Sequence, residues 1–234
     1  FFAAMPSLKI PLEEILGEIQ QWGVASPGHH VVTIYFNITE EALEGGDKAF
    51  CRDFDAMLVA SLTQEKIYSP AYLLRDGDNL LHAIKEYGWP ALKELRESYV
   101  VVLTGDDTDG GVARRRMIYS LMHPYRRKAF VDIDSSVAVT IKDGPKIRMP
   151  YFSDGMRVFF SVSPEEIPYL TTLKEHENLA GVVTRISPII NDAQWEVASK
   201  TAANIIVTDV GANNAAMAFV EEGLVDGEEE DILR

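Results

Sequence analysis

The sequence is poor in cysteine, in positive charge and in long apolar runs. Its one cysteine, Cys51, cannot form an intrachain disulfide, and the apolar helical pattern around it predicts a packed thiol. Lys and Arg number 22 against 36 Asp and Glu, a net charge of −14. This balance argues against a broad surface for nucleic acid or for an anionic membrane. No apolar run reaches the length of a transmembrane helix.

Familiar motifs of nucleotide and hydrolase chemistry are also missing. There is no histidine pair at metal-binding spacing, no nucleophile elbow, no P-loop and no dinucleotide fingerprint. Basic residues gather only at Arg114–Arg116 and Arg126–Lys128. This cluster is either a phosphate-binding site or, as we favour, the solvated faces of a helix and a loop. We expect surface positions for the five histidines, which are His29, His30, His82, His123 and His176.

Apolar runs that alternate with amphipathic segments predict an α/β protein with a mainly parallel sheet. The predicted strands cover residues 31–36, 99–103, 128–133, 182–186 and 205–210. The predicted helices cover residues 8–22, 49–62, 79–87, 164–173, 192–201 and 213–222. Residues 112–122 fit neither period cleanly, and residues 135–163 hold β-like runs separated by turns, which predicts a hairpin-like insertion. The pattern alone leaves open whether the sheet is open or closed into a barrel.

The most informative stretch is Tyr87–Asp107, with the sequence YGWPALKELRESYVVVLTGDD. It predicts a short helix with Pro90 in its first turn and an apolar face made by Leu92 and Leu95. A buried strand follows and ends in the acidic loop 106–109. Loops that follow parallel strands commonly carry chemistry. This loop is the best local candidate for a cation site, and the alternative is a solvated loop.

The same stretch resembles the segment G-W-P-T-L-x-E-L-R-G-K-V-L-F-V-L-D-N of the calcium-dependent phosphatidylinositol-specific phospholipase C-like phosphodiesterases. Segments 12–38, 67–90 and 180–210 resemble other parts of that family in the same order, whereas the match is poor between about 105 and 178. The resemblance implies a (β/α)8 TIM-barrel-like fold that lacks its first strands, with a β-rich insertion around 135–163. It implies a single partial barrel domain over 1–234, which ends in an acidic tail at 224–234.

The resemblance also implies an activity, the hydrolysis of a phosphoric diester in a phosphoinositide-type or related substrate. In the family two histidines act as base and acid, and a calcium ion offsets developing negative charge. The family's histidines precede the point where this chain begins, so no catalytic residue is assigned here. The resemblance further suggests a secreted protein, because members of the family are often exported.

Two candidate metal ligands follow from the resemblance. Asn37 stands where the family has a calcium-binding glutamate at a strand end, and its amide oxygen can ligate calcium without contributing charge. It can equally be a turn residue, with Glu40 or Glu41 as substitutes. Asp106 stands where the family has a polar residue, at the start of the acidic loop.

Two candidate phosphate-site residues lie near the end of the chain. Arg185 corresponds to the second arginine of the family's V-R-T-R strand, while Val183 replaces the first. Arg185 could hold a phosphate, or form a structural ion pair with Asp209 or Asp132. Asp209 matches the aspartate of the family's T-D-Y motif, but Val210 replaces the tyrosine.

These departures leave two hypotheses. In the first, the chain is a phospholipase C-like phosphodiesterase that is inactive or incomplete by itself. In the second, it is a non-catalytic binding or structural protein on a degenerate phosphodiesterase barrel, and the residues at 37, 183 and 210 favour this hypothesis. A part-barrel would expose strand edges at 31–37 and 205–210, so we expect either a complementary N-terminal fragment or an oligomeric partner. A phospholipid head group is the expected small partner.

Overall fold

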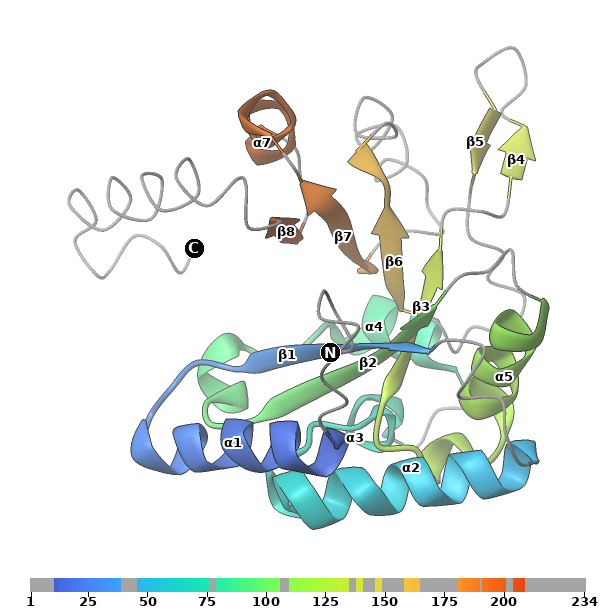
Figure 1. Ribbon diagram of the computed structural model, residues 1–234. Helices are drawn as coiled ribbons and strands as arrows, with labels where there is room; N and C mark the ends of the chain where they lie inside the picture. Colours follow the sequence, from blue (N-terminus) through green and yellow to red (C-terminus); the bar gives the residue numbers. More distant parts are fainter. Residues whose placement is uncertain are drawn as a thin grey trace. The chain divides into compact units, whose positions relative to one another are not determined.

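The computed structural model describes residues 11–38, 46–75, 79–105, 110–134, 138–140, 146–148, 158–164, 181–189, 191–200 and 204–208. These residues belong to two compact units (Figure 1). The first unit contains the described residues of 1–160 and 180–182, and the second contains those of 161–179 and 183–234. The predicted single domain and the acidic tail at 224–234 stay predictions, since the tail lies outside the described residues.

The first unit alternates helices with parallel strands. Its helices are α1 (Leu12–Ala25), α2 (Asp47–Leu62), α3 (Pro70–Leu74), α4 (Leu80–Tyr87) and α5 (Gly110–Leu121). Short 3-10 helices lie between them: η2 (Gln64–Lys66), η3 (Leu92–Leu95) and η4 (Pro124–Arg126). Its strands are β1 (Val32–Ile38), β2 (Tyr99–Gly105), β3 (Phe130–Asp134) and the short pair β4 (Ala138–Thr140) and β5 (Lys146–Arg148). The strand β6 (Phe159–Val162) crosses from the first unit into the second.

The strand β2 is the centre of the first unit's sheet. It pairs in parallel with β1, in a register that runs from Val32 opposite Tyr99 to Asn37 opposite Thr104. It also pairs in parallel with β3. All seven residues of β2 are buried, as expected for a continuous apolar strand that is covered on both faces. The predicted strands at 31–36, 99–103 and 128–133 are therefore confirmed.

The helices α1 and α2 cover one face of this sheet, as Figure 1 shows, and α5 contributes to the same core. Alternate side chains of β1 and β2 point into the core because successive strand residues face opposite sides. The core side chains include Leu16, Ile34, Phe36, Leu58, Val101, Leu103 and Tyr119. Cys51 is buried in the same layer, and its burial raises the pKa of the thiol. The predicted packed thiol is confirmed.

Three details of the first unit depart from or complete the sequence predictions. Residues 112–122, which were undecided, lie almost wholly in α5. Pro90 was predicted in a first helical turn but lies before η3, which begins at Leu92. Leu95 is buried as predicted, whereas Leu92 is 57% exposed. Residues i and i+3 lie on one face of a 3-10 helix, so the helix type does not explain why Leu92 is exposed and Leu95 is buried.

The second unit contains β7 (Val183–Ile189), α7 (Asp192–Ser199) and β8 (Ile205–Thr208). The strands β7 and β8 are parallel, and Arg185 lies opposite Ile205. Asn191 caps α7, because its side-chain oxygen accepts a hydrogen bond of 2.9 Å from the backbone N–H of Gln194. The predicted strands at 182–186 and 205–210 and the predicted helix at 192–201 are confirmed in type.

The β insertion predicted around 135–163 is confirmed only in part: β4 pairs antiparallel with β5 as a hairpin. The prediction is wrong for the end of that range, because β6 is a strand of the main sheet, where it lies next to β3. The predicted helix at 213–222 and most of the one at 164–173 lie outside the described residues. Within the described part of the chain, no helix combines the length and the apolar character needed to cross a membrane.

Candidate functional site

The carboxyl ends of β1 and β2 bring polar side chains together on the face of the sheet opposite α1 and α2. Asn37 pairs in register with Thr104, two residues beyond Tyr35 and Val102 on the same face. Asn37 is exposed and Thr104 is largely buried. The strand ends therefore present an amide and a hydroxyl side by side.

An aromatic cluster lies below these strand ends. Tyr35 meets the ring of Phe159 edge to face, with ring centroids 6.4 Å apart, and Phe159 lies 5.3 Å from Phe130. The ring centroid of Trp89 lies 5.8 Å from those of both phenylalanines. Its indole N–H donates a hydrogen bond of 2.7 Å to the carbonyl oxygen of Gly181. Tyr35 precedes Asn37 by two residues on the same face of β1, which is about 6–7 Å along the strand. The aromatic cluster therefore fills the layer of side chains next to Asn37, toward the amino end of the strand.

A guanidinium is buried at the carboxyl ends of β2 and β3. Arg116 on α5 is 1% exposed, and its Nη1 donates a hydrogen bond of 2.8 Å to the carbonyl oxygen of Asp132. Gly105 ends β2 at this point, where a Cβ would lie 2.6 Å from Cγ1 of Val112 and 3.4 Å from Nε of Arg116. The glycine therefore allows α5 and its arginine to approach the sheet.

The prediction that the basic residues lie on solvated faces is wrong for three of them. Arg115, Arg116 and Arg127 are buried, whereas Arg114 and Arg126 are exposed. Arg115 forms an ion pair of 2.9 Å with Asp47. Burial of an arginine is costly unless a carboxylate pairs with it, and the carboxylates that pair here are far away in sequence, so spacing alone does not reveal them.

A buried cluster at the amino end of β3 shifts the pKa values of two of its members, Asp55 and Tyr119. Asp55 on α2 accepts a short hydrogen bond from the Tyr119 hydroxyl and pairs at 2.9 Å with Arg127. Burial raises the pKa of Asp55, and burial together with the Asp55 carboxylate raises the pKa of Tyr119 well above its ordinary value. In α/β barrels the carboxyl ends of the strands carry the chemistry, so we assign this amino-end cluster to stability.

Arg185 lies in the second unit and is held by a serine. Its Nε and Nη2 both donate hydrogen bonds to the Ser161 hydroxyl, at 2.9 and 2.7 Å. Ser161 lies in β6, and Arg185 lies in β7. Two donors on one acceptor orient the guanidinium plane.

The structure describes two of the four predicted site residues. Asn37 belongs to the first unit and Arg185 to the second. Asp106 and Asp209 lie outside the described residues. The predictions for these two residues therefore stay predictions, as do the substitutes Glu40 and Glu41.

The donor set at the described strand ends is a poor fit to calcium. Asn37 and Thr104 supply neutral oxygens, whereas calcium takes six to eight oxygens and favours carboxylates. Among the residues that the structure describes, no three His, Cys, Asp or Glu side chains are grouped to hold a metal ion. We therefore derive no chemical step through calcium at these strand ends.

The histidines were expected at the surface. His30, His82 and His123 are exposed, whereas His29 is only partly exposed, and His176 lies outside the described residues. His82 pairs with Glu86 at 3.2 Å on the surface of α4. His29 packs between Trp22 and Tyr99, with ring centroids 5.0 and 5.9 Å away. Sequence patterns do not indicate that these three rings meet, because the rings come from separate elements.

No protein-family model and no curated protein sequence matches the chain. Solved structures do match it. A calcium-dependent phosphoinositol-specific phospholipase C from Pseudomonas sp, apo form, matches with a TM-score of 0.58 and 17% identity over 84% of this chain. The same enzyme described as a myoinositol complex matches with a TM-score of 0.59 and 17% identity over 87% of this chain.

A calcium-dependent phosphatidylinositol-specific phospholipase C from Streptomyces antibioticus matches with a TM-score of 0.61 and 15% identity. That match covers 88% of this chain and 72% of the Streptomyces chain. This chain spans 64% and 69% of the two Pseudomonas chains. Identities of 15–17% show a common fold and nothing finer. The resemblance seen in the sequence is thus confirmed in three dimensions: this chain has the fold of the calcium-dependent phosphoinositol-specific phospholipases C.

Proposed function

We propose that this chain is built on a phospholipase C-like (β/α)8 barrel and binds a phosphate-bearing head group at Arg185 of β7. The single observation that carries this proposal is the orientation of Arg185 by Ser161. Two hydrogen bonds to one hydroxyl fix the plane of the guanidinium, and a guanidinium held in a fixed plane suits recognition of a phosphate. The fold similarity to phosphoinositol-specific phospholipases supports a phosphoinositide-type or related ligand.

We propose further that the chain by itself binds and does not hydrolyse such a substrate. Acid–base cleavage needs a histidine or a comparable group within hydrogen-bond reach of the reacting oxygen. The described histidines precede β1, lie on α4 or follow α5, and none of these places is the carboxyl end of a described strand. Asn37 in place of a glutamate also lowers the charge available to a cation. Phosphoric diester hydrolysis would therefore require residues that the described part does not supply.

Assembly and export are part of the same proposal. Within the described residues, β1 pairs with β2 on one side and with no described strand on the other. An open edge of this kind favours pairing with a further strand, so we propose a complementary segment or a second copy at β1. A native mass spectrum that shows only a stable monomer would contradict this part of the proposal. Secretion stays a proposal supported by the fold resemblance alone.

The test of the binding function is a calorimetric titration of the whole chain with myo-inositol 1-phosphate. We expect saturable binding that Arg185→Gln weakens by about tenfold or more, the loss expected for charge-assisted hydrogen bonds. Ser161→Ala should weaken binding less, because it removes the two hydrogen bonds that orient the guanidinium but leaves the positive charge in place. The matched control is Arg52→Gln, which removes an exposed arginine that pairs at 2.7 Å with its neighbour Asp53.

Hydrolysis is measured in parallel with phosphatidylinositol vesicles, with and without added calcium. We expect no turnover by the chain alone, and the variant Asn37→Glu should bind calcium more tightly than the natural chain because it restores a carboxylate. Calcium-dependent turnover by the natural chain would instead establish the enzyme hypothesis. The absence of any binding to the inositol phosphate, or binding that Arg185→Gln leaves unchanged, would reject the binding function.

A further inference from the structure

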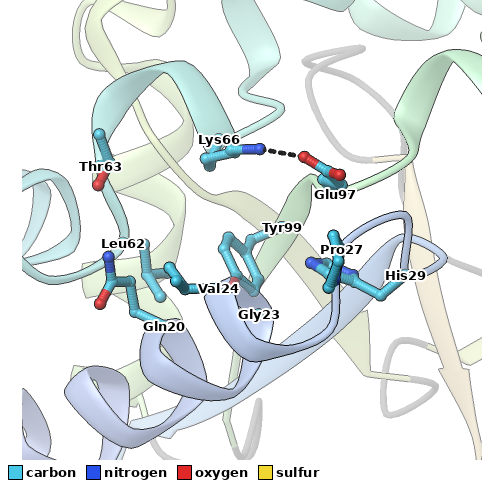
Figure 2. A pocket seen from close by; sticks show the side chains of 10 residues that line it. All are labelled: Gln20, Gly23, Val24, Pro27, His29, Leu62, Thr63, Lys66, Glu97 and Tyr99. Carbon is cyan, nitrogen blue, oxygen red and sulfur yellow. Dashed lines mark hydrogen bonds and ion pairs between the residues drawn. The ribbon is translucent and has the colours of Figure 1, made fainter.

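A cavity of about 180 Å³ opens at the amino ends of β1 and β2, between the last turns of α1 and the η2 segment (Figure 2). Asn37 and Thr104 lie at the other ends of the same two strands. Its volume is that of about six water molecules in the liquid, which is enough for a ligand of several heavy atoms. The proposed phosphate-binding function does not use this cavity.

The cavity combines an apolar interior with a charged rim. Its apolar lining comprises Leu62 and the ring of Tyr99, which are buried, and Val24, which is exposed at the opening. The rim carries Lys66 and Glu97, whose Nζ and Oε2 are 2.6 Å apart, and Figure 2 shows the two side chains pointing toward one another. One positive and one negative charge leave the rim neutral, so the cavity has no net attraction for a simple anion or cation.

The ion pair at the rim can be opened at little cost. The side chains of Lys66 and Glu97 are 46% and 39% exposed, and pairs with such exposure contribute little to stability. Glu97 is also fixed by the backbone N–H of Gly28, which donates to its Oε1 at 2.8 Å. A lysine ammonium can donate three hydrogen bonds and a carboxylate can accept about four, so each group can bind a ligand once the pair is opened.

The backbone around the cavity holds unusual conformations. Thr63 has φ 67° and Glu97 has φ 59°, and both line the cavity. A β-branched residue at positive φ is an outlier, and such strain concentrates at ligand sites. Gly23 completes the wall, because a Cβ there would collide with the Tyr99 hydroxyl and lie 3.2 Å from His29 Nε2.

His29 adds an acceptor to this wall. Its Nδ1 is 2.6 Å from the carbonyl oxygen of His30, so in the neutral ring Nδ1 carries the proton and donates. Nε2 is then the acceptor, and it lies on the side of Gly23. The cavity thus offers acceptors for a cationic group at Glu97 and His29 and a donor for an anionic group at Lys66.

We propose that this cavity binds a small zwitterion with an apolar side chain, the chemical class of a free α-amino acid. The ligand's ammonium replaces Lys66 at the Glu97 carboxylate, and its carboxylate takes the ammonium of Lys66. Each charge of the opened pair thereby regains a partner of opposite sign. The apolar side chain packs against Leu62 and Tyr99 inside the cavity and against Val24 at its opening, where it displaces water from apolar surface.

The test is a titration of the full chain with L-leucine, followed by isothermal calorimetry and by the melting temperature. Three analogues each lack one element of the ligand: 4-methylpentanoate has no ammonium, isoamylamine has no carboxylate, and glycine has no apolar side chain. We expect saturable binding of L-leucine, and binding at least about tenfold weaker for each analogue, the loss of one charged hydrogen bond or one buried apolar group.

Variants locate the site. Glu97→Gln and Lys66→Met keep the size of the side chains but remove one charge each. Each variant should therefore weaken the binding of L-leucine by about tenfold. Val24→Trp places a large ring at an exposed position of the opening and should abolish binding. The matched controls are Gln21→Trp, at an exposed position outside the lining, and Lys200→Met, which breaks an exposed ion pair with Glu196. Both controls should bind L-leucine as the natural chain does.

Three results would overturn the proposal. These are no saturable binding of L-leucine, equal binding of L-leucine and the singly charged analogues, or binding that persists in Glu97→Gln, Lys66→Met and Val24→Trp. Because Arg185→Gln leaves this cavity intact, it should not change the affinity for L-leucine. The two binding proposals therefore succeed or fail separately.

Discussion

The buried carboxylate of Asp55 predicts a large and specific contribution to stability. Its Oδ1 accepts hydrogen bonds from the Tyr119 hydroxyl and, at 3.0 Å, from the backbone N–H of Lys128, while its Oδ2 is 2.9 Å from Arg127 Nη1. The Tyr119 oxygen in turn accepts a hydrogen bond of 3.1 Å from the backbone N–H of Ala129. One side chain on α2 thus holds α5 and the start of β3.

The variant Asp55→Ala should lose about 3–5 kcal/mol of the free energy of unfolding, the cost of leaving one partner of a buried ion pair uncompensated. The side chain of Arg127 is 8% exposed, so water cannot replace the missing carboxylate without rearrangement. For a chain of this size, such a loss corresponds to a fall of about 6–20 °C in melting temperature. Urea unfolding followed by circular dichroism gives the free energy directly.

Two further variants separate charge from hydrogen bonding. Asp55→Asn keeps an oxygen for Tyr119 and for the Lys128 N–H, so it should lose less than Asp55→Ala. The double variant Asp55→Ala with Arg127→Met should recover much of the loss, because replacing both members of a buried pair by apolar groups is often near neutral. The reasoning is refuted if Asp55→Ala lies within about 1 kcal/mol of the natural chain, or if the double variant is no better than Asp55→Ala.

The pH dependence follows from the same carboxyl. Burial raises its pKa above the ordinary value of 3.8, so the folded chain binds this proton more tightly than the unfolded chain does. The contribution of Asp55 to the free energy of unfolding therefore falls as pH rises from 3.8 through the higher folded pKa. Asp55→Asn has no such group, so the advantage of the natural chain over this variant should shrink across that interval. An advantage that grows with pH there would contradict the direction of the shift.

Two substitutions test close packing in the first unit. Gly105→Ala should lose about 1–3 kcal/mol because its Cβ would press on Val112, whereas Gly17→Ala, in an open helical position, should gain about 0.5–1 kcal/mol. A stabilised Gly105→Ala would show that α5 can move away from the sheet. Trp89→Phe should lose about 1–2 kcal/mol because it removes the hydrogen bond to the carbonyl of Gly181. Equal urea midpoints for Trp89→Phe and the natural chain would contradict that assignment.

Local pattern was enough to identify most elements of this fold. The strand at 99–103 is a continuous apolar run, and such a run is stable only where both faces of a strand are covered. The helix at 8–22 was visible from its spacing, although the structure begins it at Leu12 and ends it at Ala25. The GWP segment also led to the right fold, and in the structure its Trp89 packs against Phe130 and Phe159.

By itself, then, the sequence determined the α/β class, the strands and the family resemblance, since these depend on residues that are near one another in the chain. Only the tertiary structure decided which charges are buried. The sequence pattern predicts that Arg115 and Arg127 are solvated, because their partners, Asp47 and Asp55, lie more than sixty residues away in the chain. It also decided that Lys66, Glu97 and His29 share one cavity. Parallel strands bring distant segments to the same edge of a sheet, and no local period encodes that meeting.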